Sequence, residues 1–250
     1  MTQYKPKRYK LMACAVFARE CYYCAAKSRN IIDLQIIEQG LHDVGEAKMS
    51  TALQTEIDAV DTDKYDAILL AYGLCSNGIR GLHADITLVV PKAHDCITLL
   101  MGSREKYQSY FSKNPGTFYH SSGWIENADS HLSNPESTTS EMGISTYQDY
   151  VEKYGKENAE YLMEVMGDWL RNYNKLAYID THVAEKDDYC ENEKSIAKER
   201  GWDFEKIDGS VQLIMSMVNG EWNAGDFLIL QPGETIQASN DASVIKRVAK

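Results

Sequence analysis

The chain has no run of about 18 apolar residues, the length that a membrane-spanning helix requires. It also has no excess of positive charge, because 26 Lys and Arg are outweighed by 37 Asp and Glu and the formal net charge is −11. Proteins that bind nucleic acids usually present a basic face. These absences predict a protein that neither enters a membrane nor binds nucleic acid.

Several well-known sequence motifs are missing as well. The chain has no G-x-G-x-x-G, no P-loop lysine and no G-x-S-x-G, so it does not indicate a nucleotide site or a serine triad. The N-terminus is basic but lacks the long apolar core of a signal peptide. We therefore expect a cytoplasmic protein whose six cysteines are free, metal-bound or catalytic rather than disulfide-bonded.

Strand-like and helix-like segments alternate along the chain. Strands are predicted at 9–15, 31–37, 66–72, 86–90, 176–180, 202–207 and 226–230. Helices are predicted at 17–27, 49–60, 96–107, 191–200 and 211–219, and a turn with a short helix is predicted after Asn77-Gly78. This order indicates an α/β fold with a mostly parallel sheet built from Rossmann-like βαβ units.

Two α/β halves flank a middle region of different composition. Residues 1–113 form the N-terminal half, which holds the candidate metal site. Residues 114–146 are rich in Pro, Gly and Ser and are predicted to form a long loop, either a lid or an ordinary insertion. Residues 147–250 contain a long helical region at 147–173, which joins the halves, and then the C-terminal α/β half.

Three cysteines come directly after predicted strands of the N-terminal half. These are Cys14, Cys75 and Cys96, and the last belongs to the sequence His94-Asp95-Cys96. Strands of an open parallel sheet end at one edge, so we expect these thiols to converge there. Two thiolates with one imidazole suit zinc, and three protein ligands leave a position for a substrate. The alternative is that the cysteines are small apolar core residues.

The other cysteines have different settings. Cys21 and Cys24 lie one helical turn apart and either pack a helix or, together with the three strand-end cysteines, supply an iron–sulfur cluster. Cys190 lies among carboxylates, which is typical of an inert thiol.

Four residues are candidate substrate contacts. Ser76 and Asn77 follow the third strand and either donate hydrogen bonds to a substrate carboxylate or phosphate, or cap the next helix. Arg104 offers a cation near the predicted site or is a solvated helix residue. Tyr119, in the predicted loop, is the fourth candidate.

The motifs at 65–78, 91–103, 115–119 and 123–124 resemble the DUF1638 family, and the likeness runs over most of the chain. Members of that family are found in anaerobic archaea and bacteria, often as companions of corrinoid-dependent methylamine methyl-transfer systems. The resemblance implies a role in one-carbon metabolism with a corrinoid protein or a methyltransferase as partner, and corrinoid contact through that partner. It does not supply a reaction.

A second resemblance concerns only the site. The pair His94 and Cys96 is similar to the H-x-C of zinc methyltransferases that activate thiols. Those enzymes take a third ligand from a distant downstream cysteine, which here would be Cys190, whereas the best partners in this chain, Cys75 and Cys14, lie upstream. They are also longer barrels, so the resemblance implies site chemistry and not fold.

These observations lead to one hypothesis and two alternatives. The hypothesis is a zinc protein that holds its metal through Cys75, His94 and Cys96, with Cys14 as fourth ligand or neighbour, and that activates a small thiol substrate for methyl transfer. The first alternative is a non-catalytic accessory protein that delivers a metal or ligand to a methyltransferase. The second is an iron–sulfur redox protein. A homo-oligomer is left open.

Overall fold

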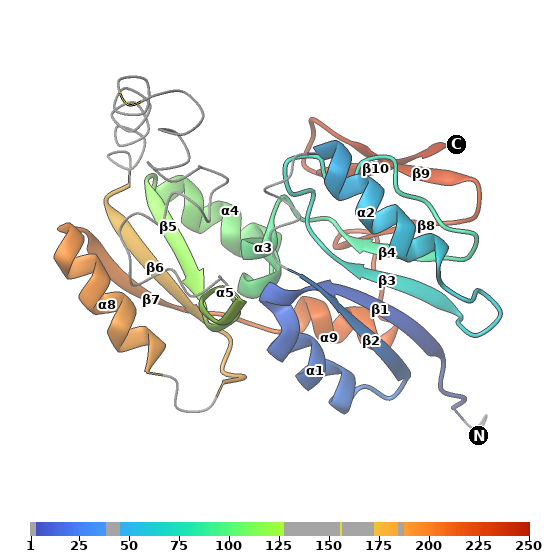
Figure 1. Cartoon of the computed structure of the whole chain (residues 1–250), viewed down its shortest axis with the longest axis horizontal. Coiled ribbons are helices and arrows are strands. Elements are labelled where there is room, and N and C mark those ends of the chain that lie inside the picture. Colours follow the sequence, from blue (N-terminus) through green and yellow to red (C-terminus); the bar gives the residue numbers. More distant parts are fainter. Residues whose placement is uncertain (1–3, 39–45, 128–155, 157–172, 185–187) are drawn as a thin grey trace.

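The computed structural model describes residues 4–38, 46–127, 156, 173–184 and 188–250. Two β-sheets lie beside each other with helices around them (Figure 1). Most of the predicted helical region at 147–173 lies outside the described residues, as do residues 128–146 of the predicted loop. The domain boundaries at 113 and 146 stay predictions.

The first sheet has five strands in the order β2-β1-β3-β4-β8. Its strands are β1 (Arg8–Cys14), β2 (Ile31–Ile37), β3 (Ala67–Ala71), β4 (Leu88–Pro91) and β8 (Phe227–Leu230). The first four are parallel, and β8 pairs antiparallel with β4 at the edge. This confirms the predicted α/β fold with a mostly parallel main sheet.

The strand order creates a switch point beside β1. The chain moves from β1 to β2 on one side and then crosses to β3 on the other side of β1. In sheets of this kind, crevices for ligands form outside the carboxyl ends of the two strands at the switch point.

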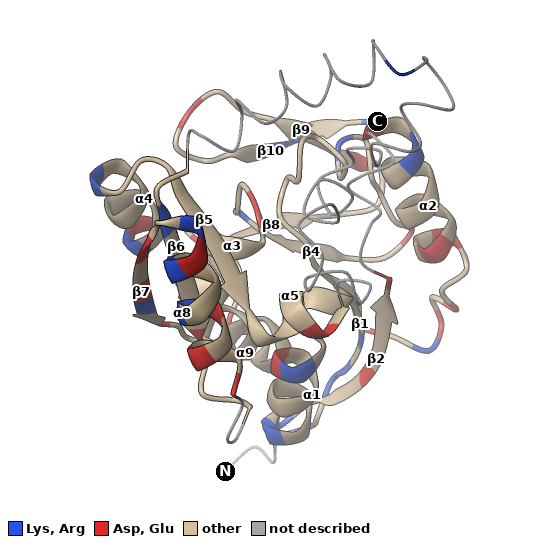
Figure 2. Ribbon diagram, turned by 60° about the vertical axis from the view of Figure 1, so that its left-hand side comes forward, with Lys and Arg blue, Asp and Glu red and all other residues tan. Residues whose placement is uncertain are grey.

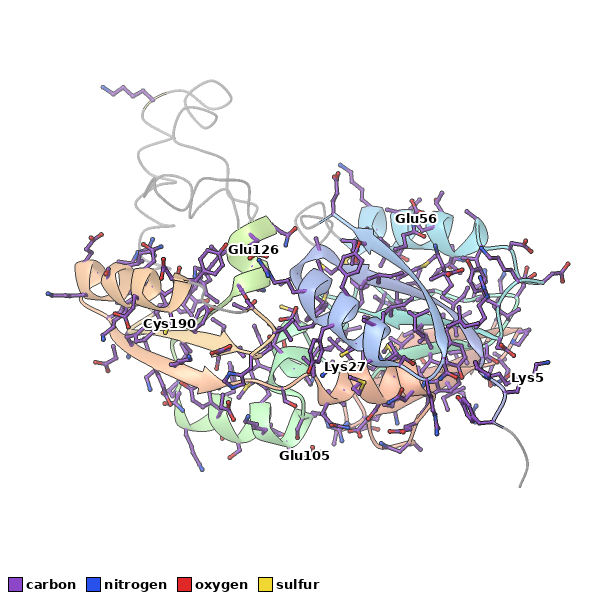
Figure 3. All side chains as sticks on the ribbon, turned by 90° about the horizontal axis from the view of Figure 1, so that it is seen from below. Lys5, Lys27, Glu56, Glu105, Glu126 and Cys190 are labelled. Carbon is purple, nitrogen blue, oxygen red and sulfur yellow. The ribbon has the colours of Figure 1, made fainter. Side chains whose placement is uncertain are left out.

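Both faces of this sheet are covered. Helices α1 (Ala18–Lys27) and α9 (Gln212–Asn219) contact each other on one face, and α2 (Glu46–Asp58) lies on the other (Figures 1 and 3). Side chains alternate along β1, so Leu11 joins the core under α1 and α9 while Met12 joins the core under α2. Strands buried on both faces are continuously apolar, which is why they could be recognised in the sequence.

The helix predicted at 96–107 is divided in two. Helix α3 (Cys96–Met101) ends at Gly102, whose φ of 72° is left-handed. Helix α4 (Arg104–Lys113) then begins after Ser103, whose side chain accepts a hydrogen bond from the Lys106 N–H. A left-handed glycine followed by a capping serine stops one helix and starts the next, so the single-helix prediction was wrong.

The second sheet is parallel and has three strands in the order β5-β6-β7. They are β5 (Thr117–Ser121), β6 (Lys175–Asp180) and β7 (Asp203–Asp208). Helix α8 (Tyr189–Arg200) packs on β6 and β7, and α5 (Ser122–Asn127) follows β5 directly. The sequence predicted loop for both β5 and α5, and this prediction was wrong for residues 117–127.

A hairpin completes the described residues. Strands β9 (Glu234–Ala238) and β10 (Ile245–Ala249) pair antiparallel, and Ile236 and Ile245 bury their side chains in the core under α2. The Gly81 N–H donates to the Ile236 carbonyl at 2.8 Å, which ties the hairpin to the segment after β3. That segment forms turns, where a short helix was predicted.

On α8 two Lys and one Arg are interspersed with three Glu, whereas α4 carries Arg104, Lys106 and Lys113 with one acidic residue, Glu105 (Figure 2). Among the described helices, none is long and apolar enough to cross a membrane.

Candidate functional site

A cavity of about 340 Å³ lies where β1, β3 and β4 reach the carboxyl edge of the first sheet. The side chains on it that carry sulfur, nitrogen or oxygen donors include Cys14, Tyr72, Cys75, His94, Asp95 and Cys96. All four predicted metal ligands therefore line one cavity, at the switch point of the sheet. That convergence follows from the parallel strands, which end at one edge of the sheet. Cys14 is the last residue of β1, Cys75 comes four residues after the end of β3, and Cys96 is the first residue of the helix after β4.

The loops after β3 and β4 are joined by backbone hydrogen bonds beyond the ends of the strands. The Leu74 N–H donates to the Ala93 carbonyl at 2.8 Å, and the Cys75 N–H donates to the His94 carbonyl at 2.9 Å. The two loops thus extend the sheet by another pair of bonds. Cys75 is held beside the H-x-C segment in a fixed register.

Gly73 makes this close approach of the two loops possible. A Cβ at this position would lie 2.7 Å from the Asp95 Cα and 2.8 Å from the Asp95 nitrogen. Backbone atoms cannot yield as a flexible side chain can, so only glycine fits here without moving one loop.

Three consecutive residues after β3 adopt left-handed backbone conformations. The φ angles are 43° for Cys75, 53° for Ser76 and 72° for Asn77. For residues with a Cβ this costs roughly 1–2 kcal/mol each. Ser76 lines the cavity, whereas Asn77 is not among its lining residues. Strained backbone of this kind is concentrated at functional sites in proteins.

Four apolar or aromatic side chains form the rest of the wall. They are Val16, Phe17, Met49 and Trp124. The first two come from the turn of 3-10 helix η1 (Ala15–Phe17) after β1, the third from α2 and the fourth from α5. The cavity is therefore shared between the first sheet and the element that leads away from the second sheet.

Helix α5 is fixed against η1 by another glycine. A Cβ on Gly123 would lie 2.0 Å from the Val16 carbonyl oxygen, so no larger residue fits. The contact places Trp124 at the cavity, where its Nε1 donates a hydrogen bond to Cys96 Sγ at 3.3 Å. The second sheet thus contributes a hydrogen-bond donor to one of the predicted ligands.

The cavity thiols are held in their protonated form by desolvation. Burial raises the pKa of Cys75 to about 12 and raises the pKa of Cys96 well above its ordinary value. Burial also raises the pKa of Cys14. Ionisation of these thiols in the cavity requires a cation or a donor that compensates the new charge.

The Asp95 carboxylate is held by hydrogen bonds from α3, which it caps, and from α4. Its Oδ1 accepts from the Thr98 N–H at 3.3 Å, and its Oδ2 accepts from the Tyr107 hydroxyl at 2.9 Å. Burial raises the Asp95 pKa, although these hydrogen bonds partly offset the effect. Tyr119 packs edge-on against Tyr107, with ring centroids 5.9 Å apart, and stands behind the cavity wall rather than in it.

The charges on the cavity favour a cation. Glu38 and Asp95 are among the lining residues, and no Lys or Arg is found among the lining residues of the described chain. The side chains that could bind a metal ion are not, however, gathered around one point in the described residues. Across the residues that the structure describes, no three His, Cys, Asp or Glu side chains stand together in a way that could hold a metal ion.

Several residues that the sequence analysis considered do not line the cavity. The Arg104 guanidinium donates to the Ala242 carbonyl at 2.7 Å through Nη1, and Arg104 is not a lining residue of the cavity, so its role as a substrate contact stays a prediction. Cys190 lies on α8, beside the second sheet and away from the first (Figure 3). Cys21 and Cys24 are fully buried in α1 and do not line the cavity.

Tyr72 and Trp124 are among the cavity residues that were not predicted from the sequence as members of a site. Tyr72 follows the last residue of β3 and looks like the end of an apolar strand. Trp124 lies in the segment 114–146, which was predicted to form a long loop. A signal for it was present, because Gly123-Trp124 follows the aromatic and β-branched stretch Thr117–Ser121, which is the composition of a strand.

A family model described as "Protein of unknown function (DUF1638)" matches residues 36–218. The chain belongs to the DUF1638 family. The region of this DUF1638 protein that matches contains Cys75, His94, Cys96 and Trp124, while Cys14 lies before it. No curated protein and no solved structure matches the chain.

Proposed function

We propose that the cavity binds one soft metal ion, zinc in preference, through Cys75, His94 and Cys96, with Cys14 as a fourth ligand or neighbour. The observation that supports this is the convergence of these side chains from three separate strand ends on one cavity. Thiolates and imidazole are the ligands that zinc prefers in proteins.

The residues present fit a metal, although they must move to bind it. The donor set is soft, the lining acids favour a cation, and His94 is exposed while the three thiols are partly exposed. Partly exposed side chains can change rotamer without disturbing the core. Each thiol must also lose its proton on binding, so metal affinity should fall as pH is lowered.

The same cavity has room for a small organic molecule beside the ion. Val16, Phe17 and Met49 give it apolar walls that exclude water from part of it, and its volume is in the range of small-ligand sites. Zinc, when bound, would supply Lewis acidity that lowers the pKa of a substrate thiol. The hydrogen bond from the Trp124 indole helps to hold the Cys96 sulfur in place.

We further propose that this activation serves methyl transfer in corrinoid-linked one-carbon metabolism in the cytoplasm. Support comes from the companionship with corrinoid-dependent systems that the sequence resemblance implies, and from a cavity that combines soft ligands with apolar walls. The partner in this proposal is a corrinoid protein or a methyltransferase, which carries the methyl group.

A non-catalytic role in metal or ligand delivery is the second candidate. It is favoured because the candidate metal ligands of the described residues do not form a preformed site. A delivery protein must release its metal, and an incompletely formed site makes release easier. The iron–sulfur alternative has less support. A cluster needs about four thiolates, but Cys21 and Cys24 of α1 are buried in the protein core and do not line the cavity.

Metal analysis of the protein purified without oxygen tests the proposal. We expect about one zinc per chain, which is the loading of a single site of this kind. Iron together with inorganic sulfide would support the cluster instead, and protein that neither retains nor takes up zinc would contradict the metal proposal. Turnover of a methylated corrinoid with a thiol would then separate an enzyme from a delivery protein.

A further inference from the structure

Strand β2 forms one edge of the first sheet. It pairs with β1 on one side, and among the described residues no strand pairs with its other side (Figure 2). None of its seven residues is buried, and Ile31 is 44% exposed, whereas β3 and β4 are buried throughout. The unpaired backbone groups of an edge strand are a template for pairing with another strand.

The hydrogen bonds to β1 show which backbone groups of β2 point outward. The Ile31 N–H donates to the Lys7 carbonyl at 2.8 Å. Along a strand the N–H and C=O groups of successive residues point to opposite sides, so Asp33 and Gln35 also face β1. The groups of the residues between them face away from the sheet. These residues are Ile32, Leu34 and Ile36.

The edge at β2 lacks the usual protection against pairing. Exposed edges of natural sheets commonly carry lysine, proline or several charges. The strand reads Ile-Ile-Asp-Leu-Gln-Ile-Ile and has neither lysine nor proline. Its one charged residue, Asp33, is paired with Arg8 at 3.1 Å and with Lys64 at 3.4 Å.

Strand β7, at an edge of the second sheet, is different. Four of its six residues are charged, namely Asp203, Glu205, Lys206 and Asp208 (Figure 2). The same chain therefore protects one sheet edge with charge and leaves the other apolar.

Exposed apolar side chains gather around β2. Among the described residues, five large hydrophobic side chains are exposed, and four of them lie on β2, on α1 or beside them: Tyr4, Tyr22, Tyr23 and Ile31. Helix α1 contacts β2, and the Tyr4 hydroxyl donates to the side chain of Asn30, the residue before β2. Exposed apolar groups that cluster in this way mark a surface for protein association.

The order of residues in β2 identifies the partner, because it is almost the same in both directions around Leu34. If two copies of β2 pair antiparallel with Leu34 opposite Leu34, apolar residues meet apolar residues and no like charges meet. The outward-facing residues then form the hydrogen-bonded pairs of the ladder. The other opposed pairs are Ile32 with Ile36, Ile31 with Ile37, and Asp33 with Gln35.

We propose that β2 is a dimer interface and that its occupant is a second copy of this chain, related by a two-fold axis at Leu34. Such an interface uses the same patch on both subunits. It joins two five-stranded sheets into one. Ile32, Leu34 and Ile36 pack on the core under α1 and α9, so their apolar row continues from one subunit into the next.

The dimer also brings the partner close to the cavity. In this register Ile37 faces Ile31, and Glu38, which follows β2 and lines the cavity, comes beside the start of the partner's strand. The pairing itself does not require the metal, so the dimer and the metal proposal can fail separately.

Sedimentation analysis of the full-length protein tests the proposal. We expect the wild type to have twice the chain mass of 28.3 kDa. Leu34→Lys and Leu34→Glu each place two like charges opposite each other, so each should weaken the dimer by about 10- to 100-fold. An equal mixture of the two variants should dimerise again, because Lys then faces Glu. A variant that had simply failed to fold would not be restored by mixing.

Asp203→Lys is the matched control, since it changes an exposed charge on the edge strand β7 and should leave the dimer as in the wild type. A monomeric wild type would overturn the proposal. A dimer that persists in both Leu34 variants would also overturn it, because another surface would then hold the subunits together. Two monomeric variants that stay monomeric when mixed would overturn the symmetric register.

Amide hydrogen exchange gives a second readout of the register. In the wild-type dimer the Ile32 and Ile36 amides should exchange slowly, and in Leu34→Lys they should exchange at least about 10-fold faster. The Asp33 amide, which faces β1, should be slow in both proteins. Fast exchange at Ile32 and Ile36 in a wild-type dimer would contradict pairing through β2.

Discussion

Replacing Gly73 with alanine is expected to abolish tight zinc binding and to lower the melting temperature. The new Cβ would lie 2.7–2.9 Å from three backbone atoms of Asp95, so the loop that carries Cys75 must move away from the loop that carries His94 and Cys96. Loss of support for a metal ligand costs up to about 100-fold in affinity. Overpacking costs about 1–3 kcal/mol, which in a chain of this size lowers Tm by several degrees.

The measurement is a competition titration of zinc together with a thermal melt. Gly225→Ala is the matched control, because its Cβ would meet only the end of the Asn223 side chain, at 3.1 Å, and Gly225 is not a lining residue of the cavity. A Gly73→Ala protein that melts lower but binds zinc like the wild type would show that the joined loops do not form the metal site.

The second large effect is expected for Cys96→Ala. If three ligands share a binding free energy of about 10–16 kcal/mol, the loss of one thiolate costs roughly 3–5 kcal/mol, or more than about 100-fold in affinity. Zinc content should therefore fall from about one per chain to nearly none after dialysis against a weak chelator. The fold should be kept, since Cys96 lies at the cavity and alanine is a good residue for the first turn of α3.

Cys190→Ala controls for the loss of any one thiol. Cys190 is partly exposed, like Cys96, but lies on α8 and is not among the cavity residues. Its zinc content should equal that of the wild type. Equal zinc loss in both variants, or none in Cys96→Ala, would mean that the metal is bound nonspecifically or by other residues.

Strands β3 and β4 of the first sheet could be predicted from the sequence because they are buried on both faces. A stretch such as Ala67–Ala71 is entirely apolar, and its pattern needs no knowledge of its neighbours. The positions of Cys14, Cys75 and Cys96 then followed from the rule that parallel strands end at one edge. Their meeting at one cavity is the part of the site that the sequence predicted; the metal itself stays a prediction.

The second sheet shows where sequence reasoning stopped. Strand β5 has five residues, and its partner β6 begins more than 50 residues later at Lys175. No local pattern identifies a partner so far away. The expected loop was therefore wrong at residues 117–127, and with it the position of Trp124 against Cys96 was missed.

Other features depend on single backbone angles or on distant contacts. The division between α3 and α4 rests on the left-handed Gly102, and the left-handed turn at Cys75 rests on hydrogen bonds to the neighbouring loop. The Arg104 guanidinium donates to the Ala242 carbonyl, 138 residues further along the chain. Such contacts arise only when the chain is folded.

Sulfur and nitrogen atoms of side chains at three strand ends are proposed to bind one ion. X-ray absorption at the zinc edge of the anaerobically prepared, zinc-loaded protein tests it most directly. We expect a mixed shell, with sulfur at about 2.3 Å and at least one nitrogen at about 2.0–2.1 Å. A shell made only of oxygen and nitrogen neighbours would contradict it.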